Sequence, residues 1–134
     1  MDKLVIDATN AILGRLCSYA AKQSLLGRDV VIVNCENMII SGNRRMIIEE
    51  YKTTVYRGGH SLKGPFFIKR SPERLVKRTV RGMLSYKQGR GAAALKRIIC
   101  YNQTPAEYTS SKKVTFEHKL KGNKMTMKEL VKEL

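Results

Sequence analysis

The chain has 134 residues, the size of one domain with a single core, and its 26 Lys and Arg against 11 Asp and Glu give a formal net charge of +15. It contains no run of about 18 apolar residues and no signal-type start, so neither a membrane-spanning helix nor an export signal is expected. Residues 51–100 hold thirteen of the basic side chains and one of the acidic ones, which favours a nucleic acid over a membrane surface as the partner.

The first half of the chain alternates strands and helices. Residues 3–7 (KLVID) are a branched apolar run that predicts a strand, and 12–26 show the wide apolar arc of a helix that covers a sheet. Residues 30–33 (VVIV) are apolar on both faces, as in a central parallel strand, and complete a βαβ unit. A shorter strand over 38–40 and a helix over 44–53 follow.

In the second half, residues 54–70 show no regular period and are predicted to form a long loop. The elements expected after this loop are a helix beginning at Ser71-Pro72, a small helical segment over 92–96, a strand over 97–101, an extended stretch over 114–116 and a helix over 126–134. Strands that alternate with helices predict an α/β fold with one mostly parallel sheet covered on both faces.

Within this single domain we expect three parts. Residues 1–53 and 91–108 would form the α/β core, 54–90 a basic RNA-binding loop and helix, and 109–134 a tail. The charge distribution supports the middle part in particular, because the excess of basic residues is concentrated there.

The helix that begins at residue 71 is predicted to have one basic face and one apolar face. Ser71 is expected to cap it, with Pro72 at the first helical position and Glu73 near the positive end of the dipole. At about 100° per residue, one arc of the helix collects Arg74, Lys77, Arg78 and Arg81. The opposite arc, expected to dock on the core, collects Leu75, Val76, Thr79, Val80, Met83 and Leu84. No acidic residue alternates with these cations, as it would on a merely solvated face, so we interpret the basic arc as a polyanion-binding surface.

Further residues extend this surface along the chain. The RNA contacts predicted outside the helix are Arg57, His60, Lys63, Lys69, Arg70, Tyr86, Lys87, Arg90, Lys96 and Arg97. Lysines are expected to contact phosphates, whereas arginines bind phosphates or stack on unpaired bases. For Phe66 and Phe67 we favour anchoring of the loop over base stacking.

The cysteines and histidines indicate neither a metal site nor a disulfide framework. Cys17, Cys35 and Cys100 are odd in number and lack C-x-x-C spacing, so we expect small buried side chains in a reducing cytosol. His60 and His118 are too few and too scattered to complete a metal site. The sequence therefore predicts a protein without a metal or other cofactor.

A catalytic role has little support. Asp7 follows the first strand, at the edge where open α/β sheets keep ligands, but a role in a turn and cap is favoured. No dinucleotide or triphosphate motif follows a strand, and residues 41–43 (SGN) fit a helix cap as well as they fit a phosphate cradle. No enzyme is expected.

Three stretches of the sequence are specific enough to indicate a family. They are VIDATNAILGRL (5–16), VVIVNCENMIISGN (30–43) and, above all, GPFFIKRSPERLVKRTVRGML (64–84), which KQGRG (87–91) follows. Together they closely resemble the universal L-thirteen family of large-subunit ribosomal proteins in its archaeal and eukaryotic form, over about residues 4–108. The resemblance implies a three-layer α/β/α fold with a four-stranded parallel sheet. It also implies non-enzymatic binding to large-subunit ribosomal RNA and a role in subunit assembly on the cytosolic ribosome.

The resemblance also assigns contacts and partners. The family's RNA-contacting helix falls on Arg74, Lys77, Arg78 and Arg81, with Lys87 and Arg90 beside it. The implied partners are large-subunit ribosomal RNA and neighbouring large-subunit proteins, with no membrane and no small-molecule substrate. Ser85 stands where relatives usually have proline, which predicts a looser exit from the helix. The long basic C-terminal helix of animal and fungal relatives has no counterpart here, so an archaeal or reduced eukaryotic source is expected.

Two alternative functions are compatible with the strand ends and the basic surface described above. One is an RNA-processing enzyme or nucleotide-dependent RNA factor that would use the strand ends near Asp7 and Ser41. The other is a regulator that binds messenger RNA away from the ribosome through the same basic surface.

Overall fold

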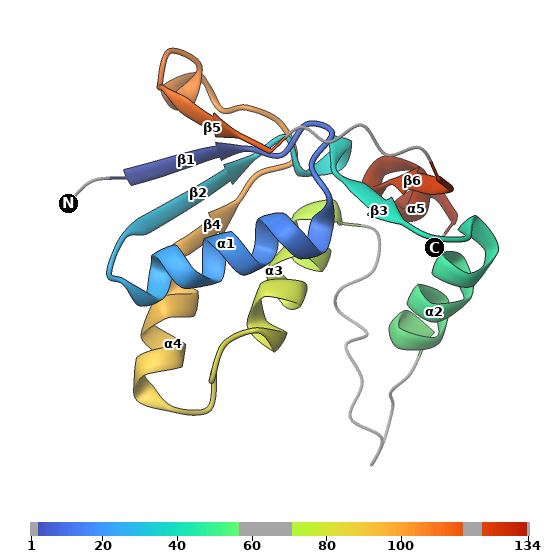
Figure 1. Cartoon of the computed structure of the whole chain (residues 1–134), viewed down its shortest axis with the longest axis horizontal. Coiled ribbons are helices and arrows are strands. Elements are labelled where there is room, and N and C mark those ends of the chain that lie inside the picture. Colours follow the sequence, from blue (N-terminus) through green and yellow to red (C-terminus); the bar gives the residue numbers. More distant parts are fainter. Residues whose placement is uncertain (1–2, 57–70, 117–121, 134) are drawn as a thin grey trace.

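The central sheet has four strands that pair in parallel. The computed structural model describes residues 3–56, 71–116 and 122–133. Strands β1 (Lys3–Asp7), β2 (Asp29–Val33), β4 (Ile98–Cys100) and β5 (Lys113–Thr115) lie in the order β4-β2-β1-β5 (Figure 1). The three pairings are all parallel, which confirms the predicted α/β class.

Helices cover one face of this sheet. They are α1 (Leu13–Leu25), α3 (Pro72–Gly82) and α4 (Gly89–Lys96) (Figure 1). The core between helices and sheet includes Ile6, Ile32 and Ile98 from the strands, all fully buried. Burial of this kind stabilises the fold by roughly 25 cal/mol per Å² of apolar surface, so the helices are fixed by packing and not by propensity alone.

The other face is covered by the segment that follows β4. This segment contains the short 3-10 helix η2 (Ala106–Tyr108), and Tyr108 packs there against Val5, Val31 and Val33. The sheet therefore lies between a layer of helices and a thinner layer made by this segment.

A second, smaller sheet lies beside the first. It pairs β3 (Ile39–Ser41) with β6 (Lys124–Thr126) in antiparallel orientation, next to α2 (Arg44–Tyr56) and α5 (Met127–Glu133) (Figure 1). The strand predicted over 38–40 exists, but it does not join the parallel sheet. The 3-10 helix η1 (Cys35–Asn37), entered through Asn34 in the left-handed region, turns the chain away from the sheet after β2.

Side-chain caps begin helices α2 and α5, and the cap at α2 was expected from residues 41–43. Thr126 and Glu129 form a reciprocal capping box at α5, and the Asn43 side chain accepts a hydrogen bond from the Arg45 amide at 2.9 Å. The cap predicted at Ser71 is wrong, because the Ser71 hydroxyl donates to the Glu73 carboxylate and does not cap α3.

The cap of α3 comes from a distant part of the chain. Asn102 Oδ1 accepts the hydrogen bond from the Glu73 amide at 3.0 Å. This contact ties the start of α3 to the segment that follows β4, and it fixes the helix against the sheet at the end where its donors are unpaired.

The cysteines lie in the core, as predicted. Cys17 and Cys35 are buried and Cys100 is half-buried. Burial raises the pKa of the Cys17 thiol, while the hydrogen bond with Cys100 and burial raise the pKa of Cys35. Among the described residues, no group of His, Cys, Asp or Glu is arranged to hold a metal ion, and no helix is both long and apolar enough to cross a bilayer.

Asp7 organises the turn at the carboxyl end of the sheet. Its Oδ1 accepts hydrogen bonds from the Thr9 amide at 3.1 Å, the Thr9 hydroxyl at 2.8 Å and the Asn34 side-chain amide at 3.0 Å. Asn34 in turn accepts from the Thr104 hydroxyl at 3.1 Å. These contacts confirm the turn interpretation of Asp7, whereas the cap interpretation is wrong, because α1 begins after Ile12 without a side-chain cap.

The Asp7 network predicts a pH-dependent contribution to stability. Partial burial by itself raises the pKa of Asp7, but the hydrogen bonds from Asn34 and Thr9, with the charge of Lys113, bring it below the ordinary value of 3.8. The contribution is therefore present above pH 3.8 and is lost as the pH falls through the folded-state pKa. We expect Asp7→Ala to lower the free energy of unfolding by about 2 kcal/mol at neutral pH, and by progressively less in acid.

Urea unfolding of both proteins at neutral and acidic pH measures this difference. Glu107→Ala, which removes an exposed carboxylate, is the control and should change the free energy of unfolding by less than about 0.5 kcal/mol. A difference for Asp7→Ala that stays constant into acid would contradict the prediction.

Candidate nucleic-acid interface

Helix α3 is held on the body by the apolar arc that the sequence predicts. Leu75, Val76, Val80 and Leu84 are buried, and the helix packs on α1, β4, η1 and α5. Met83 is an exception, because its side chain is 42% exposed. The helix ends at Gly82, so Met83 no longer follows the helical wheel that placed it on the core side.

The four cations of the basic arc do not form one uniform face. Arg74 and Arg81 are exposed, whereas Lys77 and Arg78 are half-buried. The Lys77 ammonium donates a hydrogen bond to the Ile98 carbonyl on β4. Burial lowers the pKa of Lys77, an effect that the nearby Cys100 opposes. Lys77 therefore contacts the sheet, and its long aliphatic stem lies along the body.

Arg78 lies beside a cavity between α2 and α3. The cavity has a volume of about 330 Å³, and the described residues that line it are Glu50, Tyr51, Leu75, Arg78, Thr79, Arg81, Gly82 and Tyr86. The Arg78 Nε is shielded from solvent and has no hydrogen-bond partner among the described residues. Glu50 and Tyr51 were not predicted as site residues, since the sequence carries no signal that α2 approaches α3.

The phenol of Tyr51 forms one wall of this cavity. Its side chain hydrogen-bonds with Thr79, and burial, followed by the charge of Glu50, raises the pKa of Tyr51. The phenol is therefore neutral at physiological pH and adds no negative charge to the cavity.

The exit of α3 is closely packed. The Arg81 guanidinium lies over the Tyr86 ring, 4.7 Å from its centroid, and this cation–π contact ties the last turn of the helix to the residues that follow it. The Ser85 carbonyl accepts from the Gln88 amide at 3.0 Å, and Gly91 of α4 packs against the same carbonyl. Gly91 thus makes a close contact with the exit at Ser85, and the looser exit stays a prediction.

The remaining predicted contacts fall into three groups. Lys87, Arg90 and Lys96 are exposed on or beside α4. Arg97 is half-buried and donates to the Ser24 carbonyl at 2.8 Å, so its guanidinium also serves the C-terminal end of α1. The residues that lie outside the described part of the chain are Arg57, His60, Lys63, Lys69 and Arg70, together with Phe66 and Phe67.

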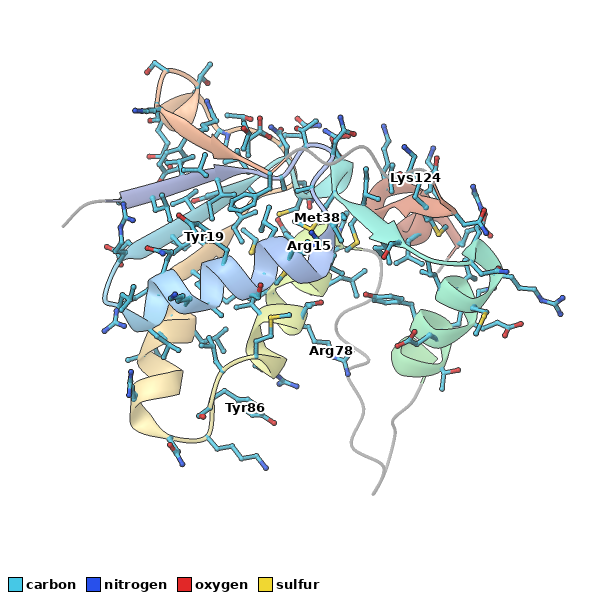
Figure 2. All side chains as sticks on the ribbon, viewed as in Figure 1. Arg15, Tyr19, Met38, Arg78, Tyr86 and Lys124 are labelled. Atoms are coloured by element: carbon cyan, nitrogen blue, oxygen red, sulfur yellow. The ribbon has the colours of Figure 1, made fainter. Side chains whose placement is uncertain are left out.

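Figure 2 shows how the labelled side chains of this region lie. Arg78 projects from α3, and Tyr86 projects from the turn that follows it, on the side of the molecule toward α2. A guanidinium and an aromatic ring are groups that bind a phosphate and an unpaired base, respectively.

Comparison with known proteins identifies the family. The sequence model of a family described as "Ribosomal protein L13" matches residues 2–107. The chain is 46% identical to the large ribosomal subunit protein uL13 of Methanosarcina barkeri, over 83% of this chain and 79% of the relative. It is 47% identical to uL13 of Archaeoglobus fulgidus over 79% of this chain and 67% of the relative, and 41% identical to uL13 of Methanocaldococcus jannaschii over 97% and 96%. The chain therefore belongs to the ribosomal protein L13 family.

Proposed function

We propose that the chain is a structural constituent of the large ribosomal subunit that binds large-subunit ribosomal RNA and supports subunit assembly. The observation that carries this proposal is the helix α3, whose apolar arc is buried while Arg74 and Arg81 remain exposed on its other side. Membership of the L13 family supports the same function, as do the relatives named large ribosomal subunit proteins. Neighbouring large-subunit proteins are the other proposed partners, and the ribosome in the cytoplasm is the proposed location.

In the proposed mechanism, RNA binds to positively charged side chains whose positions are already fixed by the packing of α3. Burial of the apolar arc and the Asn102 cap fix α3 before RNA arrives, so few side chains need to be ordered on binding. Arg74, Arg78 and Arg81 would then contact phosphates of folded RNA and read its shape more than its sequence. Lys87, Arg90 and Lys96 would extend these contacts along α4. In this proposal residues 54–90 are the basic RNA-binding loop and helix, 1–53 and 91–108 form the α/β core that carries them and adds the contact of Lys96, and 109–134 form the tail.

Sedimentation of the endogenous protein tests the proposal. We expect it to travel with large subunits and not with free messenger-RNA complexes. The purified protein should bind deproteinised large-subunit ribosomal RNA with an affinity that falls steeply as the salt concentration rises. Each phosphate contact should add about 0.7–0.9 to the steepness of log affinity plotted against log salt concentration. Sedimentation with free messenger complexes would contradict the proposal and favour a regulator, and salt-independent binding would contradict the assignment of the basic surface.

A further inference from the structure

We propose that Cys35 and Cys100 form a peroxide-sensitive thiol pair that closes to an intrachain disulfide in the folded protein. Cys100 would be the thiol that meets the oxidant, and Cys35 would be the thiol that completes the bond. This inference goes beyond the proposed function and does not depend on RNA binding, so either of them can fail without the other.

The fold brings the two cysteines together from distant parts of the sequence. Cys35 begins η1, shortly after β2, and Cys100 ends β4, the strand that pairs with β2. Cys100 lies opposite Ile32 in this pairing, and the Cys35 Sγ lies 3.8 Å from the Ile32 carbonyl oxygen. The Cys35 amide donates to the Tyr101 carbonyl at 3.1 Å, so the backbone at Cys35 is held beside the residue that follows Cys100.

The two thiols are in contact in the reduced chain. The side chains of Cys35 and Cys100 share a hydrogen bond, which together with burial raises the pKa of the Cys35 thiol. Both side chains also belong to the same packed core. Because the sulfurs are already in hydrogen-bond contact, a change of side-chain rotamer can bring them to the bonding distance of about 2 Å without separating β2 from β4.

The difference in burial between the two thiols assigns their roles. Cys100 is half-buried on β4, the strand at the edge of the sheet (Figure 1), whereas Cys35 is fully buried. The Lys77 ammonium is near enough to Cys100 for their charges to interact, and a cation beside a sulfur stabilises the negative charge with which it attacks. A small oxidant therefore reaches Cys100 first, and Cys35 is kept for the second step.

Hydrogen peroxide is the oxidant in the proposed reaction. The Cys100 thiolate attacks one peroxide oxygen, the O–O bond breaks, and the departing hydroxide takes up a proton to become water. The Cys35 sulfur then attacks the sulfur of the Cys100 sulfenic acid, the S–S bond forms and the S–O bond breaks, and the hydroxyl leaves as water with the Cys35 proton. Two thiols are oxidised and one peroxide is reduced to two waters. Cytosolic thiols reverse the bond by exchange, as is usual for redox-sensing disulfides in that compartment.

The disulfide would join two of the elements that support the basic helix. Both η1 and β4 pack on α3. A bond between Cys35 and Cys100 also closes a long loop of the unfolded chain, which lowers the conformational entropy of the unfolded state. We therefore expect oxidation to raise the midpoint of urea unfolding by roughly 1 M, and we expect a thiol reductant to reverse the change.

Peptide mapping of the full chain tests the pairing. The folded protein is treated with hydrogen peroxide, its remaining thiols are alkylated, and a non-reduced tryptic digest is analysed by mass spectrometry. Trypsin leaves Cys17, Cys35 and Cys100 on three different peptides, because Lys or Arg residues stand between them. We expect Cys35 to be linked to Cys100 and Cys17 to be alkylated.

The same chain oxidised in urea shows what the fold contributes. An unfolded chain closes short loops most readily, so Cys17 and Cys35, the two that are nearest in sequence, should be linked most often there. In native buffer, Cys17→Ala is the matched control and should keep both the Cys35–Cys100 bond and the rise in the midpoint. Adding Cys35→Ala to this variant should stop the reaction at the Cys100 sulfenic acid, which dimedone traps, and should abolish the rise.

Two results would overturn the inference. Native oxidation that leaves Cys35 and Cys100 unlinked, or that links Cys17 as often as either of them, would show that the fold does not select this pair. A midpoint that stays unchanged or falls on oxidation would show that the bond does not fit the folded chain. Both results leave the proposed function intact, because these measurements contain no RNA.

Discussion

Replacement of Arg74, Arg78 and Arg81 together by Gln is expected to lower the affinity for large-subunit ribosomal RNA by at least about 100-fold near physiological salt, or about 1 kcal/mol per arginine. The three arginines belong to a helix whose other side is buried, so packing on the core fixes the positions from which they project. In a plot of log affinity against log salt concentration, the negative slope should become less steep by about 2 to 3. This corresponds to one unit or slightly less for each phosphate contact that is lost. Binding to RNA fragments at a series of salt concentrations measures both quantities.

The control for this variant removes the same charge elsewhere. Lys124, Lys128 and Lys132 are exposed on β6 and α5, and replacing all three by Gln should reduce affinity by much less. Adding Lys77→Met to the arginine variant should cost little further affinity, because Lys77 donates to the Ile98 carbonyl. Equal losses in the arginine and lysine variants would mean that net charge, and not the position of α3, governs binding.

Gly91→Ala should be the most destabilising single-methyl substitution described here. A Cβ at this position would lie 2.0 Å from the Ser85 carbonyl oxygen and 2.3 Å from its carbon, both of them backbone atoms that cannot turn aside. We expect the free energy of unfolding to fall by about 3 kcal/mol or more. The clash is relieved only if the turn carrying Tyr86 and Lys87 moves, so RNA affinity should fall as well.

Gly89→Ala is the matched control in the same helix. A Cβ there meets nothing within 4 Å, and the loss of glycine's flexibility in the unfolded chain should make the change neutral or stabilising by up to about 1 kcal/mol. Denaturant unfolding of both variants gives the comparison. Similar unfolding free energies for Gly91→Ala and Gly89→Ala would show that the Ser85 turn yields easily and is not a fixed support.

The sequence predicts those helices and strands whose hydrophobic pattern is local. The period of α3 placed Leu75, Val76 and Val80 on the core side, and the apolar run at β2 indicated a central parallel strand, both as found. The strand predicted over 38–40 exists as β3 at Ile39–Ser41, but strand propensity does not identify the pairing partner, which is β6. The pairing depends on where the chain turns after β2, which a local pattern does not encode.

In the candidate site, too, the features that a local pattern predicts differ from the contacts that only the fold creates. A helical wheel gives the direction of Lys77 but not the carbonyl of Ile98 that lies beneath it, and it does not apply to Met83 once the helix has ended. The Asn102 cap and the approach of Glu50 and Tyr51 to Arg78 are contacts between residues far apart in sequence. Such contacts arise from the packing of whole elements, so they become visible only in the folded chain.

Both sheets are completed by strands made late in synthesis. Val5 pairs with Lys113, and Ile39 pairs with Thr126, so the native state has a high contact order and its folding must close long loops. A nascent chain that has emerged only as far as α4 leaves the β1 edge without its partner, and an unpaired edge strand is a site of aggregation. Helix α3 is thus synthesised before the framework that fixes it is closed. Intermediates of translation would bear the arginines but not yet hold them in place.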